Sequence, residues 1–322
     1  MLKNRTLVFG ASGFIGTRLV SRLAAAGHEV EAVDILPPRQ RIDGVTYSTH
    51  DVRHPLPVEI GRGVSTIFNL AAVHRTPGHP DSEYFETNVA GALNVAQLAT
   101  DCAIKTIVFT SSISVYGPSE NVLDEQSPLN PVSAYGKSKR LAEIVHQQWA
   151  QVVGDRRLVI VRPGVVFGPG ERGNYSYLAK ALSKGYFLYP GRKDTVKSGG
   201  YVDELLRTFD FALERYEKPV LYNFAYPDES SIQDIVTCFQ SIMERKAKPA
   251  TVPLPLLMTA AGTFEQAAKL GVKTPIHRER VLKLVRSTKI SPGWLKSQDY
   301  AFSTNLKTAL EAWKRETEGT FV

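Results

Sequence analysis

An α/β fold with a doubly wound parallel sheet is predicted for this 322-residue chain by two observations. Short apolar runs alternate with amphipathic helical stretches, and the runs are TLVFG, HEVEAVD, STIFNLAA, KTIVFTSS and RRLVIVRP. Val, Ile, Leu and Phe fill these runs almost continuously, which is typical of strands buried on both faces. Helical crossovers on both sides of a parallel sheet account for both observations.

The first run meets a glycine-rich turn that opens a helix. Gly10 permits a tight turn, Gly13 lets the backbone approach a pyrophosphate, and Gly16 allows the helix to pack closely on the strand. Free N–H groups at the start of such a helix favour a phosphate. This strand–turn–helix unit, with Phe14 and Ile15 in its first helical turn, predicts a Rossmann-type dinucleotide site.

The second run ends on Asp34, where a dinucleotide fold needs a carboxylate for the adenosine ribose hydroxyls. A carboxylate there repels a 2′-phosphate, so NAD is favoured over NADP. Arg39 and Arg41 could meet such a phosphate if their loop folds back. Asp51, followed by Val52, comes after the next short strand and is a candidate partner for the adenine amino group; a helix cap or loop carboxylate is an equal alternative.

Tyr135 and Lys139 stand four residues apart in the run SAYGKSKRLAE. On a helix this offset places both side chains on one face, and an ammonium beside a phenol lowers the pKa of the phenol. Such pairs also arise by chance in exposed helices. The dinucleotide turn at the head of the chain makes an acid/base device the better interpretation.

The order of the motifs resembles extended short-chain dehydrogenases/reductases of the NAD-dependent epimerase/dehydratase type. GASGFIG, Asp34, NLAA, NVAGALNV, TSSISVYG, YGKSK and RPGVVFGPG follow in the order of that family. The resemblance runs over most of the chain and is strongest from residue 2 to about 170. It weakens beyond that point, where such enzymes build their substrate lobes.

The resemblance implies roles for individual residues. Ser112 would be the catalytic serine, Tyr135 the catalytic acid/base and Lys139 its helper. Beyond the glycine turn and the acidic residues, the implied cofactor-binding residues are Leu70, Ala71, Ala72, Asn88, Ser111, Tyr135, Lys139 and Pro163. The substrate-binding residues expected are His74, Ser112, Ser114, Tyr135, Asn174, Lys197 and Arg286.

The chemistry of these residue types agrees with those roles. Removing hydride from a secondary alcohol requires a base on the hydroxyl, so Tyr135 should act as a phenolate held ionised by Lys139 and the nicotinamide charge. Ser112 would donate a second hydrogen bond to the substrate oxygen. Ile113 and Ser114 stand where 4,6-dehydratases carry an Asp-Glu pair, so dehydration is disfavoured.

Several of these residues keep an alternative role. Ser111 and Ser114 also fit strand-end hydroxyls bonded to backbone, and His74 fits a structural or loop-capping histidine. Asn174 serves equally well as an N-cap for the following helix. Lys197 stands where epimerases carry a diphosphate-binding residue, although arginine is more usual there.

A diphosphate-binding arginine is also expected in the tail, where Arg278, Arg280 and Arg286 are equal candidates. The tail stretch TPIHRERVLKLVRSTKISPGWLK resembles the steroid-dehydrogenase branch of the same superfamily as well.

The expected division of the chain is interwoven. Residues 1–165 plus about 201–225 should form the NAD-binding domain, and about 166–200 and 226–322 the substrate lobe. Two helices, about 83–100 and 134–153, commonly form a four-helix dimer interface in this family, so a homodimer is expected by resemblance.

Bulk properties indicate an ordinary globular enzyme, with 43% hydrophobic and 22% charged residues. The net charge of +7 suits an anionic cofactor and substrate, and no aromatic-basic stripe suggests nucleic acid. We expect a cytoplasmic protein without a membrane segment. Cys102 and Cys238 lack metal-ligand spacing and are expected to be reduced core thiols without a metal or disulfide.

The first functional hypothesis is therefore a nucleotide-diphosphate-sugar epimerase with tightly held NAD, which transiently oxidises one sugar carbon, with C4 as the expected position. The second is an NAD(P)-dependent dehydrogenase or reductase of a sugar nucleotide, hydroxysteroid or other secondary alcohol. A non-catalytic NAD-sensing protein is the third, because a fold alone proves no reaction. Retention of Tyr135, Lys139 and Ser112 argues against it.

Overall fold

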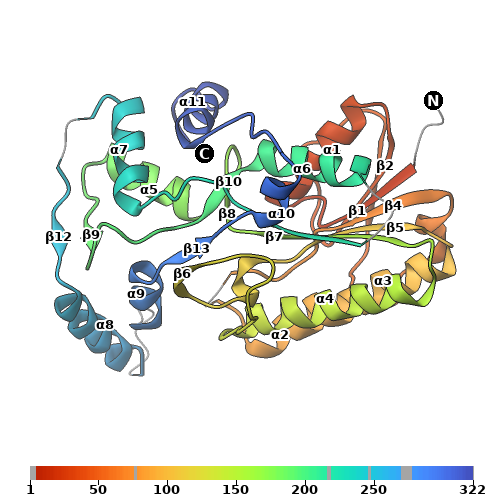
Figure 1. The fold of residues 1–322 in the computed structure, drawn as a ribbon, viewed down its shortest axis with the longest axis horizontal. Helices are drawn as coiled ribbons and strands as arrows, with labels where there is room; N and C mark the ends of the chain where they lie inside the picture. Colours follow the sequence, from red (N-terminus) through yellow and green to blue (C-terminus); the bar gives the residue numbers. More distant parts are fainter. Residues whose placement is uncertain (1–4, 76–77, 216–218, 246–247, 270–277, 322) are drawn as a thin grey trace.

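The computed structural model describes residues 5–75, 78–215, 219–245, 248–269 and 278–321, and Figure 1 shows its layers. The strands of the central sheet are β1 (Arg5–Phe9), β2 (Glu29–Asp34), β3 (Val45–Thr49), β4 (Val64–Asn69), β5 (Thr106–Thr110), β7 (Arg157–Pro163) and β11 (Val220–Phe224). The shorter strands are β6 (Ser119–Leu123), β8 (Val165–Phe167), β9 (Tyr189–Pro190), β10 (Gly199–Tyr201), β12 (Thr251–Val252) and β13 (Thr288–Ile290).

The helices are α1 (Phe14–Ala25), α2 (Asp81–Phe85), α3 (Gly91–Asp101), α4 (Ala134–Val152), α5 (Asn174–Ser183), α6 (Val202–Arg215), α7 (Ile232–Ile242), α8 (Leu254–Lys269), α9 (Arg278–Val285), α10 (Gly293–Ser297) and α11 (Leu306–Glu316). A π-helical turn at Glu86–Ala90 joins α2 to α3. The helix expected over about 83–100 is therefore one helical run with a widened turn in its middle.

The central sheet has seven strands in the order β11-β7-β5-β4-β1-β2-β3, and every neighbouring pair is parallel. The five apolar runs of the sequence form β1, β2, β4, β5 and β7. The predicted doubly wound parallel sheet is confirmed. The strand order reverses between β1 and β4, which is where ligands bind in folds of this kind.

Alternating side chains of the strands serve two cores. Leu7 and Phe9 face α3 and α4, whereas Val8 between them faces α1 and α6. Figure 1 shows the same division, with α3 and α4 along one face of the sheet and α1 and α6 along the other. Burial on both faces explains why these strands are apolar at nearly every position.

The second lobe has its own core of aromatic rings. Phe167 stacks on Tyr175 with ring centroids 4.3 Å apart, and Trp313 and Phe239 complete the cluster with α5, α7 and α11. α10, although it lies in the range expected for this lobe, packs on the sheet through Leu295. We propose the expected interwoven division of the chain with this one change.

The two cysteines are free thiols, and each is half-buried rather than deep in the core. Cys102 lies at the rim of the sheet core beside Gly61, and Cys238 lies on α7. Among the described residues, no cluster of three His, Cys, Asp or Glu side chains is arranged to hold a metal. The described helices include none with the length and apolar character needed to cross a membrane.

Removal of the Phe209 ring tests the packing of α6 on the sheet. The ring is 0% exposed and lies 5.9 Å from that of Phe68. We expect Phe209→Ala to lower the free energy of unfolding by about 3 to 5 kcal/mol. Urea unfolding measures this, with Val152→Ala, at a position 76% exposed, as the neutral control. Equal stability of the two variants would contradict this account of the core.

Candidate active site

The glycine turn lies at the carboxyl end of β1, where the sheet order reverses. Gly10 has φ +76°, and a Cβ there would lie 2.8 Å from the backbone N of Ala71. A Cβ on Gly16 would lie 2.1 Å from the carbonyl oxygen of Gly10. Glycine is therefore required at both positions, at one by the backbone conformation and at the other by close packing of α1.

The start of α1 fits a dinucleotide diphosphate. Phe14 and Ile15 begin the helix, and its N-cap is Gly13, which offers no side chain to the first N–H groups. Those donors, together with the helix dipole, form an anion site at the switch point of the sheet. Leu70 and Ala71 cover the turn from β4, and the N–H of Leu70 donates to the carbonyl of Phe9.

Asp34 lies at the end of β2 beside this turn. Its Oδ2 accepts a hydrogen bond from the N–H of Ser12 at 2.9 Å, and its Oδ1 accepts one from the N–H of Leu36 at 3.0 Å. The carboxylate is thereby fixed at the edge of the glycine turn, where its remaining lone pairs can accept ribose hydroxyls. The residues present fit NAD.

Asp51 has a partner within the protein. The Arg53 guanidinium holds the pKa of Asp51 below its ordinary value through hydrogen bonds, and the two side chains lie 2.6 Å apart at their closest atoms. Asp51 thus lies in the loop with an ion pair, which matches the alternative of a loop carboxylate. Val52 is buried against Gly91, and its carbonyl accepts a hydrogen bond from Asn94.

Asn88, in the π-helical turn, joins the coenzyme side to the catalytic helix. Its Oδ1 accepts from the N–H of Val73, just beyond Ala72, and its Nδ2 donates to the Val73 carbonyl and to Oγ of Ser138 at 2.8 Å. Ser138 in turn donates to the carbonyl of Tyr135. The loop after β4 and the first turn of α4 are therefore fixed to each other.

Ser112 and Tyr135 meet at the C-terminal edge of β5. A hydrogen bond with Ser112 tends to lower the pKa of Tyr135, but the surrounding protein desolvates the phenol and raises its pKa to about 12. We expected Lys139 to lower the pKa of Tyr135. In the protein without coenzyme this does not happen, because desolvation of the phenol has the larger effect. Ser112 Oγ also donates to Oγ of Ser114 and accepts from its N–H, so the position of the Ser112 hydroxyl is fixed.

Lys139 lies one turn further along α4 and is only 2% exposed. Its Nζ donates to the carbonyl of Thr110 at 2.8 Å and lies 4.8 Å from the ring centroid of Phe109. Burial lowers the pKa of Lys139 to about 7, and the charge of Glu143 opposes that shift. The ammonium is thus poised to exchange its proton near neutral pH.

The sequence analysis overlooked Gly136. A Cβ at this position would lie 2.4 Å from the carbonyl oxygen of Ser114. Glycine therefore lets the first turn of α4 approach the serine segment closely enough for Tyr135 to meet Ser112. The sequence carried a signal for this contact, because glycine disfavours a helix and is expected inside one mainly where close packing requires it.

A buried ion pair beneath the serines was also missed. Arg162 donates to both carboxylate oxygens of Glu143, at 2.8 and 2.7 Å, and the two side chains are 3% and 0% exposed. Ser111 Oγ donates to Glu143 at 2.6 Å, so the hydroxyl is bonded to a side chain rather than to backbone as the alternative predicted; contact of Ser111 with the coenzyme stays a prediction. A charged Arg162 in the apolar strand that ends at Pro163 should have signalled a buried partner.

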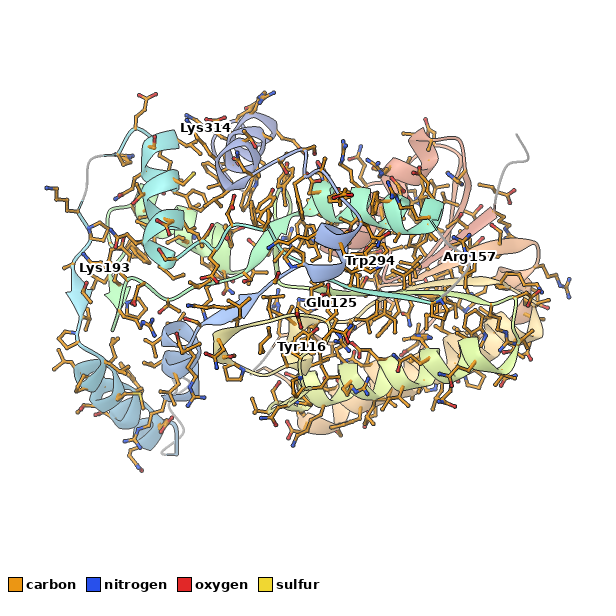
Figure 2. All side chains as sticks on the ribbon, in the orientation of Figure 1. Tyr116, Glu125, Arg157, Lys193, Trp294 and Lys314 are labelled. Carbon is orange, nitrogen blue, oxygen red and sulfur yellow. The ribbon has the colours of Figure 1, made fainter. Side chains whose placement is uncertain are left out.

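Arg162 extends this network toward the C-terminal part of the chain. It donates to the Tyr116 hydroxyl, which donates to Asn223 at the end of the sheet. Glu125 accepts from the N–H groups of Asn223 and Trp294. Figure 2 shows Tyr116, Glu125 and Trp294 grouped where β6 passes under the sheet edge. The serine segment is therefore held from below on several sides.

The expected substrate residues are distributed around this centre. Partial burial, with the charges of Lys139 and Arg75, lowers the pKa of His74, which places this histidine in electrostatic reach of Lys139. Asn174 is exposed in the first turn of α5, and Gly173 is the N-cap, so the capping alternative for Asn174 is wrong.

Lys197 and Arg286, far apart in sequence, lie together. Nζ of Lys197 donates to the backbone carbonyl of Arg286 at 2.7 Å, and burial lowers the pKa of Lys197 to about 8. Arg278 pairs instead with Glu265 of α8 at 3.8 Å. The side chain of Arg280 lies outside the described residues. Of the three arginines, Arg286 lies beside the expected diphosphate position.

Comparisons with known proteins agree on the fold. Residues 6–225 match the profile described as NAD dependent epimerase/dehydratase family. An N-acetyl-alpha-D-glucosaminyl-diphospho-ditrans,octacis-undecaprenol 4-epimerase of Escherichia coli O157:H7 is 30% identical over 319 residues, covering 96% of this chain and 94% of the relative.

A 3-beta-hydroxysteroid dehydrogenase of Mycolicibacterium neoaurum is 25% identical over 65% of this chain and 61% of its own length. The solved structure of MoeE5 in complex with UDP-glucuronic acid and NAD superposes with a TM-score of 0.77 at 24% identity. It covers 98% of this chain and all of its own.

The burial of Lys139 has a consequence for stability. The folded pKa of about 7 lies below the ordinary 10.5, so between these values the unfolded chain binds more protons and folding becomes more favourable as pH rises. Lys139→Met removes this dependence. We expect its stability relative to wild type to be higher at pH 6 than at pH 9, by about 2 kcal/mol.

Urea unfolding of the coenzyme-free protein at both pH values makes the measurement. Lys137→Met, at an exposed position two residues away on the same helix, is the matched control and should show no such difference. A pH-independent effect of Lys139→Met would mean that the ammonium is not desolvated.

Proposed function

Because the chain belongs to the NAD-dependent epimerase/dehydratase family, we propose that it is an NAD-dependent 4-epimerase of a sugar carried on a diphosphate. The observation that supports this most is the meeting of Ser112 with Tyr135, one helical turn from a buried Lys139 that donates to the carbonyl of Thr110, in a sheet that also carries the glycine turn. The E. coli relative, which is named as a 4-epimerase and matched along nearly its whole length, favours C4 as the carbon.

Tyr135 and Ser112 have different roles in the proposed reaction. Bound NAD supplies a hydride acceptor next to the substrate carbinol. Tyr135 accepts the proton of the substrate hydroxyl and later returns it, while Ser112 donates a hydrogen bond to the same oxygen and stabilises its developing charge. Tyr135 must first lose its own proton, and the cation at Lys139 together with the charge of NAD provides the necessary lowering of its pKa.

The site residues also favour epimerisation over water elimination. Ile113 and Ser114 follow Ser112, and Ile113 is buried, so neither position offers a carboxylate to remove a proton from the neighbouring carbon. An enzyme that removes hydride and returns it to the other face needs no such group. We keep a net dehydrogenase as the second candidate, favoured by the similarity to the hydroxysteroid dehydrogenase.

We propose that Lys197 and Arg286 face the diphosphate of the substrate. They come together from separate parts of the chain, and Arg286 is exposed where Lys197 is half-buried. A diphosphate is common to nucleotide sugars and to sugars on polyprenol carriers such as the one that names the E. coli relative. These two residues alone do not distinguish the carriers.

We further propose that the protein is a cytoplasmic homodimer formed through α3 and α4. Leu93, Leu141 and Ile144 are 55%, 43% and 38% exposed on these two helices. Such apolar side chains on adjacent surface helices are what a four-helix interface would cover. Light scattering of the purified protein tests the mass of the assembly.

Tyr135→Phe tests the acid/base role. We expect turnover of the sugar substrate to fall about 100- to 10,000-fold, because proton transfer is lost while the ring remains. Dinucleotide released on denaturation should be unchanged in amount, which shows that the coenzyme site is intact. A variant that turned over normally would overturn the assignment.

The reaction type is separated by the fate of the coenzyme. We incubate native protein with UDP-, GDP- and CDP-sugars and with a polyprenyl-diphosphate N-acetylglucosamine, without added NAD. An epimerase gives a new sugar isomer and no net change in NADH absorbance. Steady NADH formation from a sterol or simple alcohol, with NAD supplied, would establish the dehydrogenase instead.

Asp34→Asn tests the preference for NAD over NADP. The amide removes the negative charge that repels a 2′-phosphate, and its single oxygen can accept only one of the two backbone hydrogen bonds that Asp34 accepts from Ser12 and Leu36. We expect the NAD/NADP affinity ratio to fall about tenfold, measured by titration of protein freed of coenzyme. An unchanged ratio would show that the carboxylate does not face the ribose.

A further inference from the structure

α8 has a surface that is unusual for an exposed helix. Leu256 and Phe264 are 65% and 42% exposed, two turns apart on one side, and Thr259, Ala260 and Thr263 between them are exposed as well. None of these five residues is charged, whereas the outer side of a surface helix is normally polar and ionic. Leu284 on α9, the helix that packs against α8, is 50% exposed and adds a further exposed apolar side chain to this part of the second lobe.

The segment around this surface is strongly basic. Between residues 254 and 289 the sequence has seven Lys or Arg and two Glu, which is a net charge of +5 out of +7 for the whole chain. Among the described side chains, Arg278 borders an open groove of about 540 Å³ that is lined by Met258, Gly262 and Thr263. The combination of exposed apolar side chains with a net positive segment of sequence matches helices that bind at the surface of anionic membranes.

The position of this surface connects it to the substrate. α8 and α9 lie at the outer end of the second lobe, far from α1 and α3 (Figure 1). α9 ends at Val285, next to Arg286, whose carbonyl holds the ammonium of Lys197 at 2.7 Å. Val285 also packs at Gly191, where β9 ends. Leu284, which belongs to the apolar surface, is therefore only two residues in sequence from Arg286, which we propose to meet the diphosphate.

We propose that the face formed by Leu256, Phe264 and Leu284, the lipid-facing surface, docks on an anionic phospholipid bilayer and presents the active site to a sugar diphosphate carried on a membrane lipid. The substrate class rests on the proposed 4-epimerase activity; the docking does not. Membrane contact was not expected from the sequence, because no segment is long enough to cross a bilayer. A helix lying in the interface needs no such length.

A protein partner or a second copy of the chain is less favoured by the same observations. A protein interface of this size normally combines its apolar centre with a mixed polar rim. The sequence from 254 to 289 has a net charge of +5, so two copies of this segment would repel each other. An anionic bilayer neutralises it.

Vesicle sedimentation of the full chain tests the docking directly. We expect binding to vesicles of phosphatidylcholine with about one third phosphatidylglycerol, weaker binding to phosphatidylcholine alone, and weakening by salt. Leu256→Gln/Phe264→Gln should bind anionic vesicles about tenfold more weakly. Val152→Gln, which changes an equally exposed apolar residue on α4, should bind as wild type does.

Wild-type protein that stays in solution with anionic vesicles would overturn the proposal, as would a double variant that binds them equally well. A double variant whose assembly mass falls in light scattering, without vesicle binding by wild type, would assign the surface to a second copy. These outcomes are independent of catalysis, so they remain decisive even if no sugar is turned over.

Activity separates the substrate class. The double variant should convert a soluble UDP-sugar as fast as wild type but convert a polyprenyl-diphosphate sugar in vesicles about tenfold more slowly. If the double variant lost the same share of its activity on both substrates, α8 would contribute to the substrate cleft and not to membrane binding. If the double variant kept full activity on both substrates, the lipid-linked sugar would be excluded as the substrate that requires docking.

Discussion

The buried ion pair between Glu143 and Arg162 is the constraint on which the catalytic geometry depends. Both charges are removed from water, so each requires the other and every remaining lone pair needs a donor. Ser111 supplies one donor and Tyr116 receives one, which ties β5, β7 and α4 together directly below Ser112. We infer that this pair fixes the positions of the surrounding side chains more than it adds to the free energy of unfolding.

Glu143 also sets the electrostatic balance of α4. Tyr135, Lys139, Glu143 and His146 follow one another along the side of the helix that faces the sheet. The carboxylate opposes the loss of the Lys139 proton, while burial and the charge of Lys139 lower the pKa of His146 to about 3. His146 is therefore neutral, pairs with Asn69 and adds no second cation. Lys139 is then the group on this side of α4 that can change its charge near neutral pH.

The sequence could predict the sheet and the coenzyme turn because both follow from local patterns. Apolar runs at strand length define β1, β2, β4, β5 and β7, and the glycine spacing is a short-range requirement. The ion pair below Ser112 could not be assigned in the same way, because Glu143 and Arg162 are each ordinary residues until the fold places them together. The effect of burial on Tyr135 was likewise invisible, since spacing reveals a neighbouring charge but not the loss of solvent.

The substrate side was the hardest to predict for a physical reason. The Rossmann half binds the same coenzyme throughout such enzymes, so its sequence pattern is constrained. The second lobe binds substrates that differ, and it is built from several segments that are far apart in the sequence. Lys197 and Arg286 meet because Lys197 pairs with Thr288 in a parallel bridge, which brings the end of α9 beside it. The basic, apolar character of α8 and α9 lies in the same returning segment. The same returning segment also packs on the serine segment, because Ile290 of β13 clusters with Ile113, Val115 and Tyr116, so carrier recognition, diphosphate binding and the position of Ser112 are physically linked.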